Sequence, residues 1–370
     1  MVYGIRKSIL DIEKNSYAKE DHLPKDLSNY IDCSSGINPF GCSGEVKERL
    51  KKLSWEDVNC YPESSMDIKQ CIAQYWEEVA DLKKNQIFLG DGSIGIIYKI
   101  NKLFLEKSSR VLGYSPQFTD YIDDVKSYGG KYEYCLLNKE KNFKFDLQLF
   151  LNKMEDSHNL FYLDNPNNPT GQIIDIKTIE QILKKAKSLN RPVIIDEAYG
   201  DFMNLSQSAI SLINNYHNLF VIRTFSKGLG LAGLRAGYLI TSRNFGKYYT
   251  LISNPYEMNA VARYLAVYAI RDSNFIKKSN ESIREAKKRL IDSLKVFNPL
   301  NTDLGVPIMT IKHPDSQVDL EKYLMGHGIL SVSGEGFIGL DKSYVRLRMP
   351  NDIEGLIKKF KDIEKQLEKH

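Results

Sequence analysis

The stretch Pro192-Val-Ile-Ile-Asp-Glu-Ala-Tyr199 joins a continuous apolar run to an acidic residue and a tyrosine. Strands buried on both faces of a parallel sheet have such runs, and ligands in these sheets bind beyond the carboxyl ends of the strands. Similar runs alternate with helical patterns, which predicts an α/β fold with a mostly parallel seven-stranded sheet sandwiched by helices. The strands are expected at residues 86–89, 110–114, 132–137, 160–164, 192–196, 219–224 and 236–241.

The last third of the chain departs from this alternation and predicts a second, smaller α/β domain. A long helical pattern from Asn259 to Phe297 is interrupted near Asp272. The sequence Pro-Asn-Asp that ends at Asp352 is a typical start signal for a closing helix. Between them we expect strands at 307–312, 329–332 and 344–349 and a helix at 318–327.

The patterns divide the chain into three expected units. The N-terminal residues contain few elements of their own, and no internal repeat or low-complexity linker interrupts the remainder. The predicted units are an N-terminal arm over 1–43 that packs on the small domain, a large ligand-binding domain over 44–262, and a small C-terminal domain over 263–370.

Composition and charge place the chain among ordinary globular proteins. Of its 370 residues 42% are apolar and 26% are charged, and 51 basic against 47 acidic residues give a net charge of +4. These charges are spread along the chain, so we expect no nucleic-acid partner. No apolar run approaches the roughly 18 residues that a membrane span requires, and the N-terminus lacks the apolar core of a signal peptide.

Cysteine and histidine usage indicates a cytoplasmic protein without a metal centre. The five cysteines are odd in number and show no CxxC spacing, which favours reduced thiols. The six histidines stand apart from one another, and none forms an HxxxH pair. We therefore expect a cytoplasmic localisation and no metal ligands.

Lys227 ends the run Val-Ile-Arg-Thr-Phe-Ser-Lys at the end of a predicted strand, 31 positions after Asp196 and 8 before Arg235. A lone lysine is usually a solvated surface residue. A lysine in a cationic, partly desolvated site instead has a lowered pKa and acts as nucleophile and base, and its amine can form a Schiff base with an aldehyde. The neighbouring hydroxyls and the arginine favour this second interpretation.

Polar groups at two other strand ends suit the same ligand. Asp196 is costly to bury at the mouth of an apolar strand unless it is paired, for example with a pyridinium N–H, although an N-cap role is also common for Asp at such a place. Tyr199 and Asn168 can hydrogen-bond a phenolate oxygen. Asn168 lies in the turn Asn165–Gly171, whose prolines and asparagines are equally expected in a rigid turn without a function.

Two glycine-rich stretches, Gly90–Gly95 and Gly228–Gly233, match the pattern GxGxxG, which shows how weak that pattern is. A dinucleotide site also needs an acid after the next strand, and the sequence there reads Gly-Tyr-Ser-Pro. A single phosphate resting on the helix-terminal amides of Gly92, Ser93 and Ile94 fits the first stretch better. A tight strand-to-helix turn is the alternative.

These groups in combination match one cofactor. Pyridoxal 5′-phosphate (PLP) needs a lysine for its aldehyde and an acid for its ring nitrogen, together with partners for its phenolic oxygen and its phosphate. Lys227, Asp196, Tyr199 and Asn168 suit the first three, and hydroxyls with Arg235 can hold a phosphate. The combination therefore predicts a PLP site, although each part alone is weak.

Arg346 and Arg348 lie on a late predicted strand, two residues apart, so their side chains should point to the same face. A guanidinium can clasp a carboxylate with two hydrogen bonds, so one of them could orient an amino-acid substrate. Pairing with acids at the surface is the alternative for both.

The chain resembles the fold-type-I PLP enzymes of the class I/II aminotransferase family, from Asn38-Pro39 to about Arg346. Within that family it resembles the branch of the histidinol-phosphate aminotransferases and threonine-phosphate decarboxylases. Arg223-Thr-Phe-Ser-Lys-Gly-Leu-Gly-Leu-Ala-Gly-Leu-Arg235 is most similar to the aminotransferases, and Asp32-Cys-Ser-Ser-Gly-Ile-Asn-Pro-Phe-Gly41 is more similar to the decarboxylases.

The resemblance implies a role for each matching residue. Lys227 would form the Schiff base with PLP and carry protons, Asp196 would bind the ring nitrogen, and Phe118 would stack on the ring. Tyr61 would reach the cofactor phosphate of a neighbouring subunit, which implies a homodimer. The remaining implied contacts are Asn168 and Tyr199 to the phenolic oxygen, Gly92, Ser93, Ile94, Thr224, Ser226 and Arg235 to the phosphate, and Arg346 and Asn38 to the substrate.

The expected activity is a PLP-dependent transfer of an amino group from a small amino compound, with or without a phosphate, to an oxo acid or oxo compound. The first alternative is a PLP-dependent decarboxylase of an O-phospho amino acid. A binding module of the same fold without chemistry, such as the cofactor-sensing half of a regulator, is a further alternative. A dehydrogenase rests only on the glycine patterns.

Overall fold

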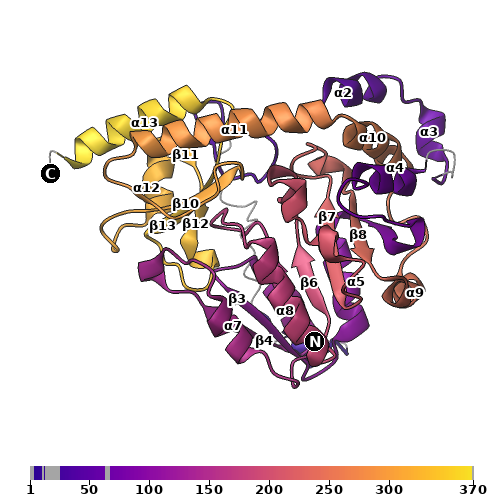
Figure 1. Ribbon diagram of the computed structural model, residues 1–370. Helices are drawn as coiled ribbons and strands as arrows, with labels where there is room; N and C mark the ends of the chain where they lie inside the picture. The colour runs from indigo at the N-terminus through magenta and orange to yellow at the C-terminus, as the bar shows by residue number, and fades with distance from the viewer. Residues whose placement is uncertain (1–3, 11, 13–25, 63–66, 369–370) are drawn as a thin grey trace.

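The computed structural model describes residues 4–10, 12, 26–62 and 67–368. It is built around a seven-stranded sheet, several strands of which are labelled in Figure 1. The strand order is β2-β8-β7-β6-β5-β3-β4, and only β8 runs antiparallel to its neighbours in this sheet. The predicted, mostly parallel sheet is therefore confirmed. Its strands are β2 (Ile87–Gly90), β3 (Arg110–Ser115), β4 (Lys131–Leu136), β5 (Leu160–Asp164), β6 (Val193–Asp196), β7 (Leu219–Thr224) and β8 (Gly237–Thr241).

Helices cover both faces of the sheet because its central strands are apolar on both sides. In β6, Ile194 packs in one core with α5 and α6, while Val193 and Ile195 pack in the other with α4, α8 and α10. Each such buried side chain stabilises the fold by about 1.5–3 kcal/mol. The helices of this domain are α2 (Gly44–Leu50), α3 (Trp55–Asn59), α4 (Ile68–Tyr75), α5 (Gly92–Phe104), α6 (Thr119–Ser127), α7 (Leu147–Lys153), α8 (Ile176–Ser188), α9 (Arg243–Ile252) and α10 (Ala260–Arg271).

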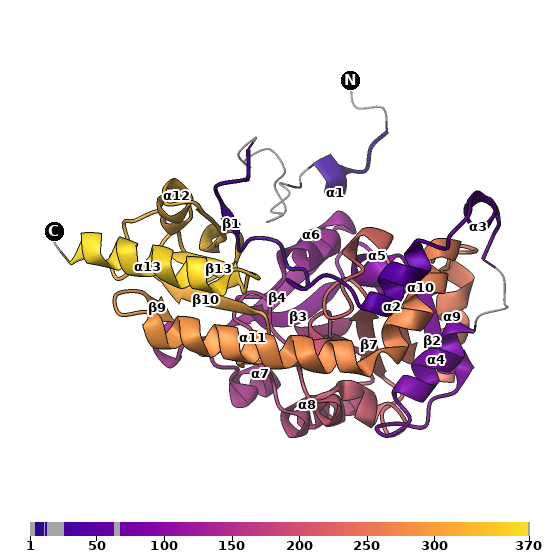
Figure 2. The ribbon, with the colours of Figure 1, turned by 90° about the horizontal axis from the view of Figure 1, so that it is seen from above.

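The second domain is built on a four-stranded antiparallel sheet with the order β12-β13-β10-β9. The predicted helix interruption is real, because the Asp272 side chain accepts a hydrogen bond from the Phe275 amide and starts α11. Helix α11 then runs across the molecule beside α13 (Figure 2). The elements are β9 (Asn298–Pro299), β10 (Ile308–Lys312), β12 (Val332–Ser333), β13 (Tyr344–Arg348), α11 (Ser273–Ser293), α12 (Leu320–Gly326) and α13 (Ile353–Leu367).

The N-terminal arm contacts both domains. Strand β1 (Ile31–Asp32) pairs in parallel with β11 (Ile329–Leu330) of the small domain, as expected for an arm that packs there. Helix α1 (Lys7–Leu10) instead contacts α6, and the Ser8 hydroxyl donates to the Ser127 carbonyl oxygen at 2.9 Å. This first helix therefore differs from the prediction, because its partner lies in the large domain. Residues 1–3, 11 and 13–25 of the arm lie outside the described part, and the boundaries 1–43, 44–262 and 263–370 stay a prediction.

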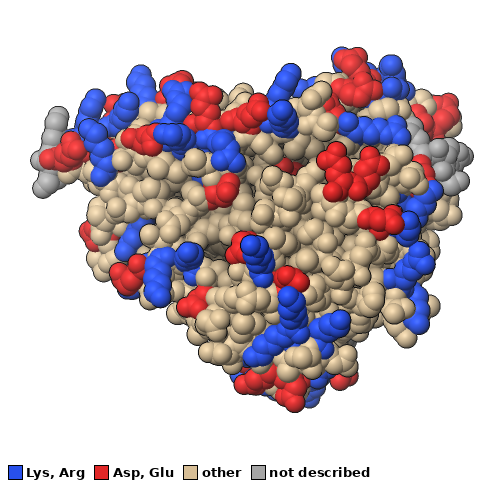
Figure 3. Space-filling model, viewed as in Figure 1, with Lys and Arg blue, Asp and Glu red and all other residues tan. Residues whose placement is uncertain are grey.

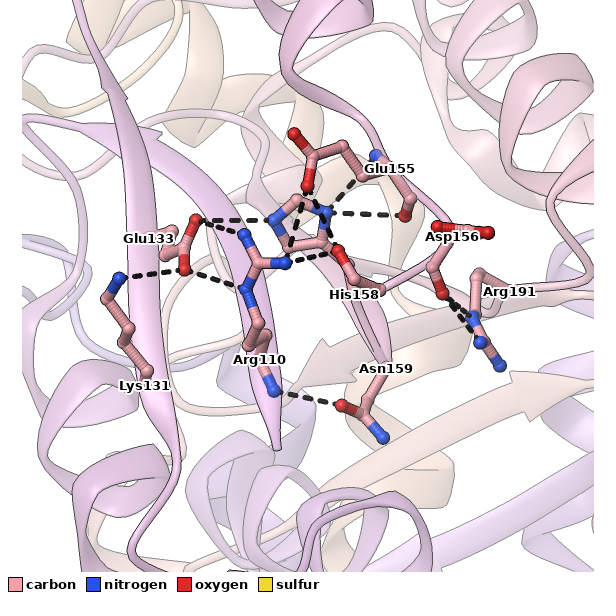
Figure 4. A network of polar contacts seen from close by, with 9 residues as sticks. Arg110, Lys131, Glu133, Glu155, Asp156, His158, Asn159 and Arg191 are labelled. Atoms are coloured by element: carbon pink, nitrogen blue, oxygen red, sulfur yellow. Dashed lines mark hydrogen bonds and ion pairs between the residues drawn. The ribbon is translucent and has the colours of Figure 1, made fainter. Parts of the chain in front are cut away.

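The amino ends of β3, β4 and β5 are joined by a network of charged side chains (Figure 4). Arg110 donates to both carboxylate oxygens of Glu133, at 2.8 and 2.9 Å, and also contacts Glu155. The hydrogen bonds from Arg110 lower the pKa of Glu133 to about 2. These ion pairs hold the strands together at their amino ends. Ligands in such folds bind at the opposite edge, beyond the carboxyl ends of the strands.

The outer surface carries charges of both signs. On the face shown in Figure 3, acidic and basic side chains are interspersed rather than gathered in one basic patch. Within the described ranges, no helix is long and apolar enough to cross a membrane.

A buried lysine of α11 holds a loop of the small domain that contacts the large domain. The Lys287 ammonium of α11 lies within 2.8 Å of four oxygens, those of the Thr302 hydroxyl and of the Asp303, Val306 and Ile308 carbonyls. Burial lowers the pKa of Lys287 well below its usual value. The loop that it holds donates from the Asp303 amide to the Gly171 carbonyl, so α11 is tied to the turn that contains Asn168.

We expect Lys287→Met to lower the free energy of unfolding by roughly 2–4 kcal/mol, because the buried oxygens lose their donor. Lys288→Met is the matched control, since its side chain is exposed and pairs with Asp292 at the surface, where it should cost less than about 0.5 kcal/mol. Urea unfolding of both variants measures the difference. Similar decreases in the free energy of unfolding of the two variants would contradict a stabilising role of the buried Lys287 ammonium.

Candidate active site

The ends of β6 and β7 and the arm meet around the Lys227 amine. A Cβ atom placed on Gly36 would overlap the Tyr199 hydroxyl and would lie 3.1 Å from Lys227 Nζ. Lys227 Nζ lies 5.5 Å from the centre of the Tyr199 ring. Three segments distant in sequence therefore converge at one point, and Gly36 must be a glycine to let them do so. Gly36 was not among the predicted site residues, although it lies in the Asp32–Gly41 stretch.

A buried ion cluster of Arg223, Glu197 and Asp201 lies against the loop that carries Lys227. Arg223 of β7 donates to Glu197 at 3.0 Å and also pairs with Asp201. The Asp201 side chain in turn packs directly against the backbone of Gly228. A Cβ on Gly228 would overlap Asp201, so only a glycine permits this close approach. These contacts fix the backbone on both sides of the catalytic candidates Tyr199 and Lys227.

Asp196 is a buried carboxylate at the end of β6. Its oxygens accept hydrogen bonds from the Tyr162 hydroxyl and the Ala198 amide, both at 3.0 Å. Burial, followed by the charge of the neighbouring Asp164, raises the pKa of Asp196 to about 7. Asp196 is not the N-cap that the sequence alternative expects, because Tyr199 occupies that position before the short 3₁₀ turn that follows, without a side-chain capping hydrogen bond. Asp196 thus suits a ligand that brings a positively charged N–H group.

The Tyr199 hydroxyl is buried and has no hydrogen-bond partner among the described residues. A buried polar atom of this kind normally has a partner, so it marks a place for a ligand atom. Asn168 lies in the same region, and its side-chain oxygen accepts from Arg346 at 3.0 Å. Tyr199 and Asn168 are therefore placed as two groups that could meet one oxygen of a ligand.

Arg346 and Arg348 of β13 are both buried, so neither is a surface residue. Arg348 nevertheless pairs with the half-exposed Asp32 at 3.5 Å, as the sequence alternative expects for it. Arg346 donates to the Ser34 carbonyl at 2.6 Å, and Arg348 donates to the Ser35 carbonyl at 2.6 Å. The two arginines hold the arm segment that carries Gly36 over the Lys227 amine. Arg346 also contacts Asn168, and this contact places it at the site.

A cluster of phosphate-binding candidates forms where α5 begins beside the loop after β7. Its six predicted members are Gly92, Ser93, Ile94, Thr224, Ser226 and Arg235. The first amides of a helix have no partner within the helix, and α5 begins at Gly92. A Cβ on Gly92, which has a φ of +81°, would lie 2.9 Å from the Arg235 guanidinium. Arg235 also donates to the Ser226 hydroxyl at 3.5 Å, and Thr224 donates to the same hydroxyl at 2.9 Å.

The other predicted residues are placed differently. The Phe118 amide donates to Asp164 at 3.3 Å, close to the turn of Asn168. Asn38 is buried and its amide donates to the Gly228 carbonyl and to Ser279, so it holds the Lys227 loop, and these contacts do not favour the predicted contact with substrate. Tyr61 is 76% exposed and its ring stacks on Tyr256, with 4.7 Å between the ring centres. No contact joins Tyr61 to the other candidates within the described chain.

Comparisons with known proteins identify the family. The model of the family "Aminotransferase class I and II" matches residues 28–360. The chain belongs to this family. It is 30% identical to a histidinol-phosphate aminotransferase of Methanococcus aeolicus over 92% of this chain and 89% of that protein. It is 32% identical to a protein of Caldanaerobacter subterraneus subsp. tengcongensis that is assigned as a threonine-phosphate decarboxylase, over 85% and 84% of the two chains.

Solved structures agree with this family membership. The histidinol-phosphate aminotransferase of Clostridium acetobutylicum superposes with a TM-score of 0.81 at 26% identity, over 91% of this chain and 99% of that one. The predicted fold-type-I architecture is thereby confirmed. The histidinol-phosphate aminotransferase of Sinorhizobium meliloti, which superposes with a TM-score of 0.82 at 20% identity over 99% of both chains, was solved in complex with PLP. The predicted cofactor PLP is that of this family. The site fits that cofactor, because the buried Asp196 carboxylate and the unpartnered Tyr199 hydroxyl match a ring N–H and a phenolic oxygen.

The cofactor-free protein is expected to lose stability as the pH rises from about 4 to about 7. Folded Asp196 keeps its proton up to a pKa of about 7, whereas unfolded Asp releases it near pH 4, so raising the pH favours unfolding. Asp196→Asn has no proton to release and should lack this part of the pH dependence.

Thermal unfolding of the cofactor-free wild type and of Asp196→Asn is measured at about pH 5 and about pH 8. The midpoint of the wild type should fall by more than that of Asp196→Asn between these two pH values. The exposed Asp362→Asn is a matched control and should follow the wild type. Parallel curves for wild type and Asp196→Asn would show that Asp196 is not a buried, protonated acid.

Proposed function

We propose that this PLP-dependent aminotransferase takes its amino group from a small phosphorylated amino compound of the kind that names its histidinol-phosphate aminotransferase relatives. The observation that carries the proposal is the convergence of the Lys227 amine, the unpartnered Tyr199 hydroxyl and the Asp196 carboxylate at one edge of the sheet. The 30% identity to such an aminotransferase along most of both chains supports the substrate class.

Each side chain has a proposed task. Lys227 Nζ would bind the aldehyde of PLP, and its amine is the group placed to carry a proton at the substrate Cα. Asp196 holds the ring nitrogen in its protonated form, while Tyr199 and Asn168 bind the phenolic oxygen. When bound, PLP acts as an electron sink for the bond that breaks at the substrate Cα. The cup of Gly92, Ser93, Ile94, Thr224, Ser226 and Arg235 holds its phosphate, and Phe118 packs on its ring.

Arg346 orients the substrate in this proposal. Its guanidinium is buried next to Asn168, so a substrate carboxylate or phosphate that reaches it comes close to the phenolic oxygen of the cofactor. To bind such an anion with two hydrogen bonds, Arg346 exchanges its present contact with the Ser34 carbonyl for the anion. The arm segment from Ser34 to Gly36 therefore borders the substrate.

Decarboxylation of an O-phospho amino acid is the second candidate. It is favoured by the 32% identity to the protein assigned as a threonine-phosphate decarboxylase. It is also favoured by the Asp32–Gly41 stretch, which Arg346 and Arg348 hold over the lysine. The residues that handle PLP are the same for both reactions, and the direction in which the substrate carboxylate is held decides between them.

We also propose that the protein acts as a homodimer in the cytoplasm, with Tyr61 reaching the cofactor phosphate of the partner. Three large apolar or aromatic side chains of α3 and the segment after it are exposed: Trp55, Val58 and Tyr61, at 69%, 68% and 76%. A group of large exposed apolar side chains of this kind is typical of a surface that another chain covers. The five cysteines are all free thiols, in keeping with a reducing compartment.

The activity is tested by incubating the enzyme with histidinol phosphate and 2-oxoglutarate and, separately, with O-phosphothreonine alone. Transfer of the amino group to the oxo acid without release of CO₂ is the expected result. Release of CO₂ from O-phosphothreonine without any oxo acid would overturn it in favour of the second candidate. Lys227→Ala should lower the rate by at least roughly 10²-fold, since proton transfer by a positioned base contributes that much. Lys51→Ala, at an exposed lysine, is the control and should keep the wild-type rate.

Tyr61→Phe should weaken the retention of PLP without unfolding the protein, because the change removes only one hydroxyl at an exposed position. The fraction of PLP that remains bound after dialysis measures this retention. Tyr98→Phe, at another exposed tyrosine, is the control. Unchanged retention in Tyr61→Phe, or sedimentation of the wild type as a monomer, would count against the proposed partner contact.

A further inference from the structure

Asp164, the last residue of β5, is a second buried carboxylate at the site and was not among the predicted site residues. Only 3% of its surface is exposed, yet its two oxygens accept five hydrogen bonds. The donors are the Tyr114 hydroxyl at 2.7 Å, the Gln117 amide at 3.2 Å, the Asn167 side-chain amide at 3.1 Å, and the backbone amides of Phe118 at 3.3 Å and Asn168 at 2.9 Å.

These donors come from two loops that handle different parts of the cofactor in the proposed function. Gln117 and Phe118 follow β3, whereas Asn167 and Asn168 follow β5. Oδ2 of Asp164 accepts the backbone amides of both Phe118 and Asn168. One oxygen atom therefore sets the distance between the residue proposed to pack on the ring and the residue proposed to bind its phenolic oxygen.

The hydrogen bonds favour the ionised form of Asp164. A backbone N–H can only donate, so Oδ2 must be an acceptor that carries no proton. The ionised carboxylate can satisfy all five donors at once, although burial opposes this by raising the pKa of Asp164. The five donors are all uncharged, so they leave the negative charge of the carboxylate unbalanced.

Asp164 and Asp196 are register partners on the parallel strands β5 and β6. Adjacent strands lie about 4.8 Å apart, and partners in register point to the same face, so the two carboxylates are neighbours. The charge of Asp164 is one cause of the raised pKa of Asp196. Two buried acids side by side are stabilised by a ligand that brings a positive charge between or beside them.

We propose that Asp164 is a positioning residue for PLP, which holds Phe118 and Asn168 with one carboxylate and adds a second negative charge beside Asp196 that keeps the ring nitrogen protonated. This inference rests on the proposed function, since it uses the roles given there to Phe118, Asn168 and Asp196. It explains why a strand end in an apolar sheet carries an acid with five donors. An apolar residue there would leave two backbone amides without acceptors.

Few of the groups around Asp164 change charge near neutral pH. The pKa values of Tyr114, Tyr132 and Tyr162 are all raised well above 10, in the first place by burial. The titratable groups around the pair are Tyr114 of β3, Tyr132 of β4, Tyr162 of β5 with Tyr121 of α6 stacked on it, and Glu197 and Tyr199 after β6. The charges of Arg346 and Arg348 of β13 act on Tyr199. The effect of a change at Asp164 is therefore expected in the titration of Asp196 and in the binding and absorbance of the cofactor.

Asp164→Asn, which keeps the shape and removes the charge, tests the proposal in the full-length enzyme. PLP is titrated into the cofactor-free protein, and the visible absorbance of the loaded protein is followed against pH. We expect the dissociation constant for PLP to rise at least about tenfold. We also expect the absorbance transition to move to lower pH by about one unit, because a neighbouring negative charge that stabilises cationic groups is lost. Asp362→Asn, at an exposed aspartate of α13, should leave both unchanged.

Two variants at the donors separate the charge from the fold. Tyr114→Phe and Gln117→Leu each remove one donor and keep the carboxylate, so each should weaken PLP binding by less than Asp164→Asn and move the transition in the same direction. They also decide the matter if Asp164→Asn does not fold. Unchanged PLP affinity and an unmoved transition in all folded variants would overturn the proposal. A wild-type protein that binds no PLP would instead overturn the proposed function, which is a different result.

Discussion

The structure depends on one costly arrangement, the burial of negative charge at the carboxyl ends of β5 and β6. Asp164 and Asp196 lie side by side at the ends of two strands whose other residues are apolar or aromatic, and burial raises the pKa of both. A folded chain tolerates such a pair when hydrogen bonds and a cationic partner compensate for the lost hydration. The five donors to Asp164 supply the first requirement, and in the proposed function the protonated ring nitrogen of PLP would supply the second.

The surrounding architecture keeps that arrangement rigid and brings a lysine and an arginine to it. Arg223 pairs with Asp201, which packs against Gly228 in the loop after β7. In this loop the Lys227 amine faces the Tyr199 ring. Arg346 and Arg348 of the small domain donate hydrogen bonds to the Ser34 and Ser35 carbonyls, and these bonds hold the arm next to the Lys227 amine. In the proposed function, the residues for the cofactor and for the substrate therefore meet at the contact between Arg346 and Asn168.

Much of this could be predicted because it leaves a local signal in the sequence. Strands Leu160–Asp164 and Leu219–Thr224 were predicted to the residue, since continuous apolar runs have well-marked ends. The expected strand at 329–332 is in fact two short strands, β11 and β12, because the chain leaves one partner for another near Ser331. Asp164 and Gly36 were missed because contacts distant in sequence decide their roles. Asp164 meets Phe118, 46 positions away, and Gly36 meets Tyr199 and Lys227, 163 and 191 positions away, and such contacts leave no periodic pattern.

The central claim is that a buried acid pair and one lysine together hold a cationic aldehyde cofactor. It is tested most directly by a crystal structure of the protein grown with PLP. The account predicts continuous electron density from Lys227 Nζ to the cofactor, with the ring nitrogen within hydrogen-bonding distance of the Asp196 carboxylate and next to Asp164. A cofactor bound elsewhere, or a ring nitrogen directed away from both carboxylates, would contradict it.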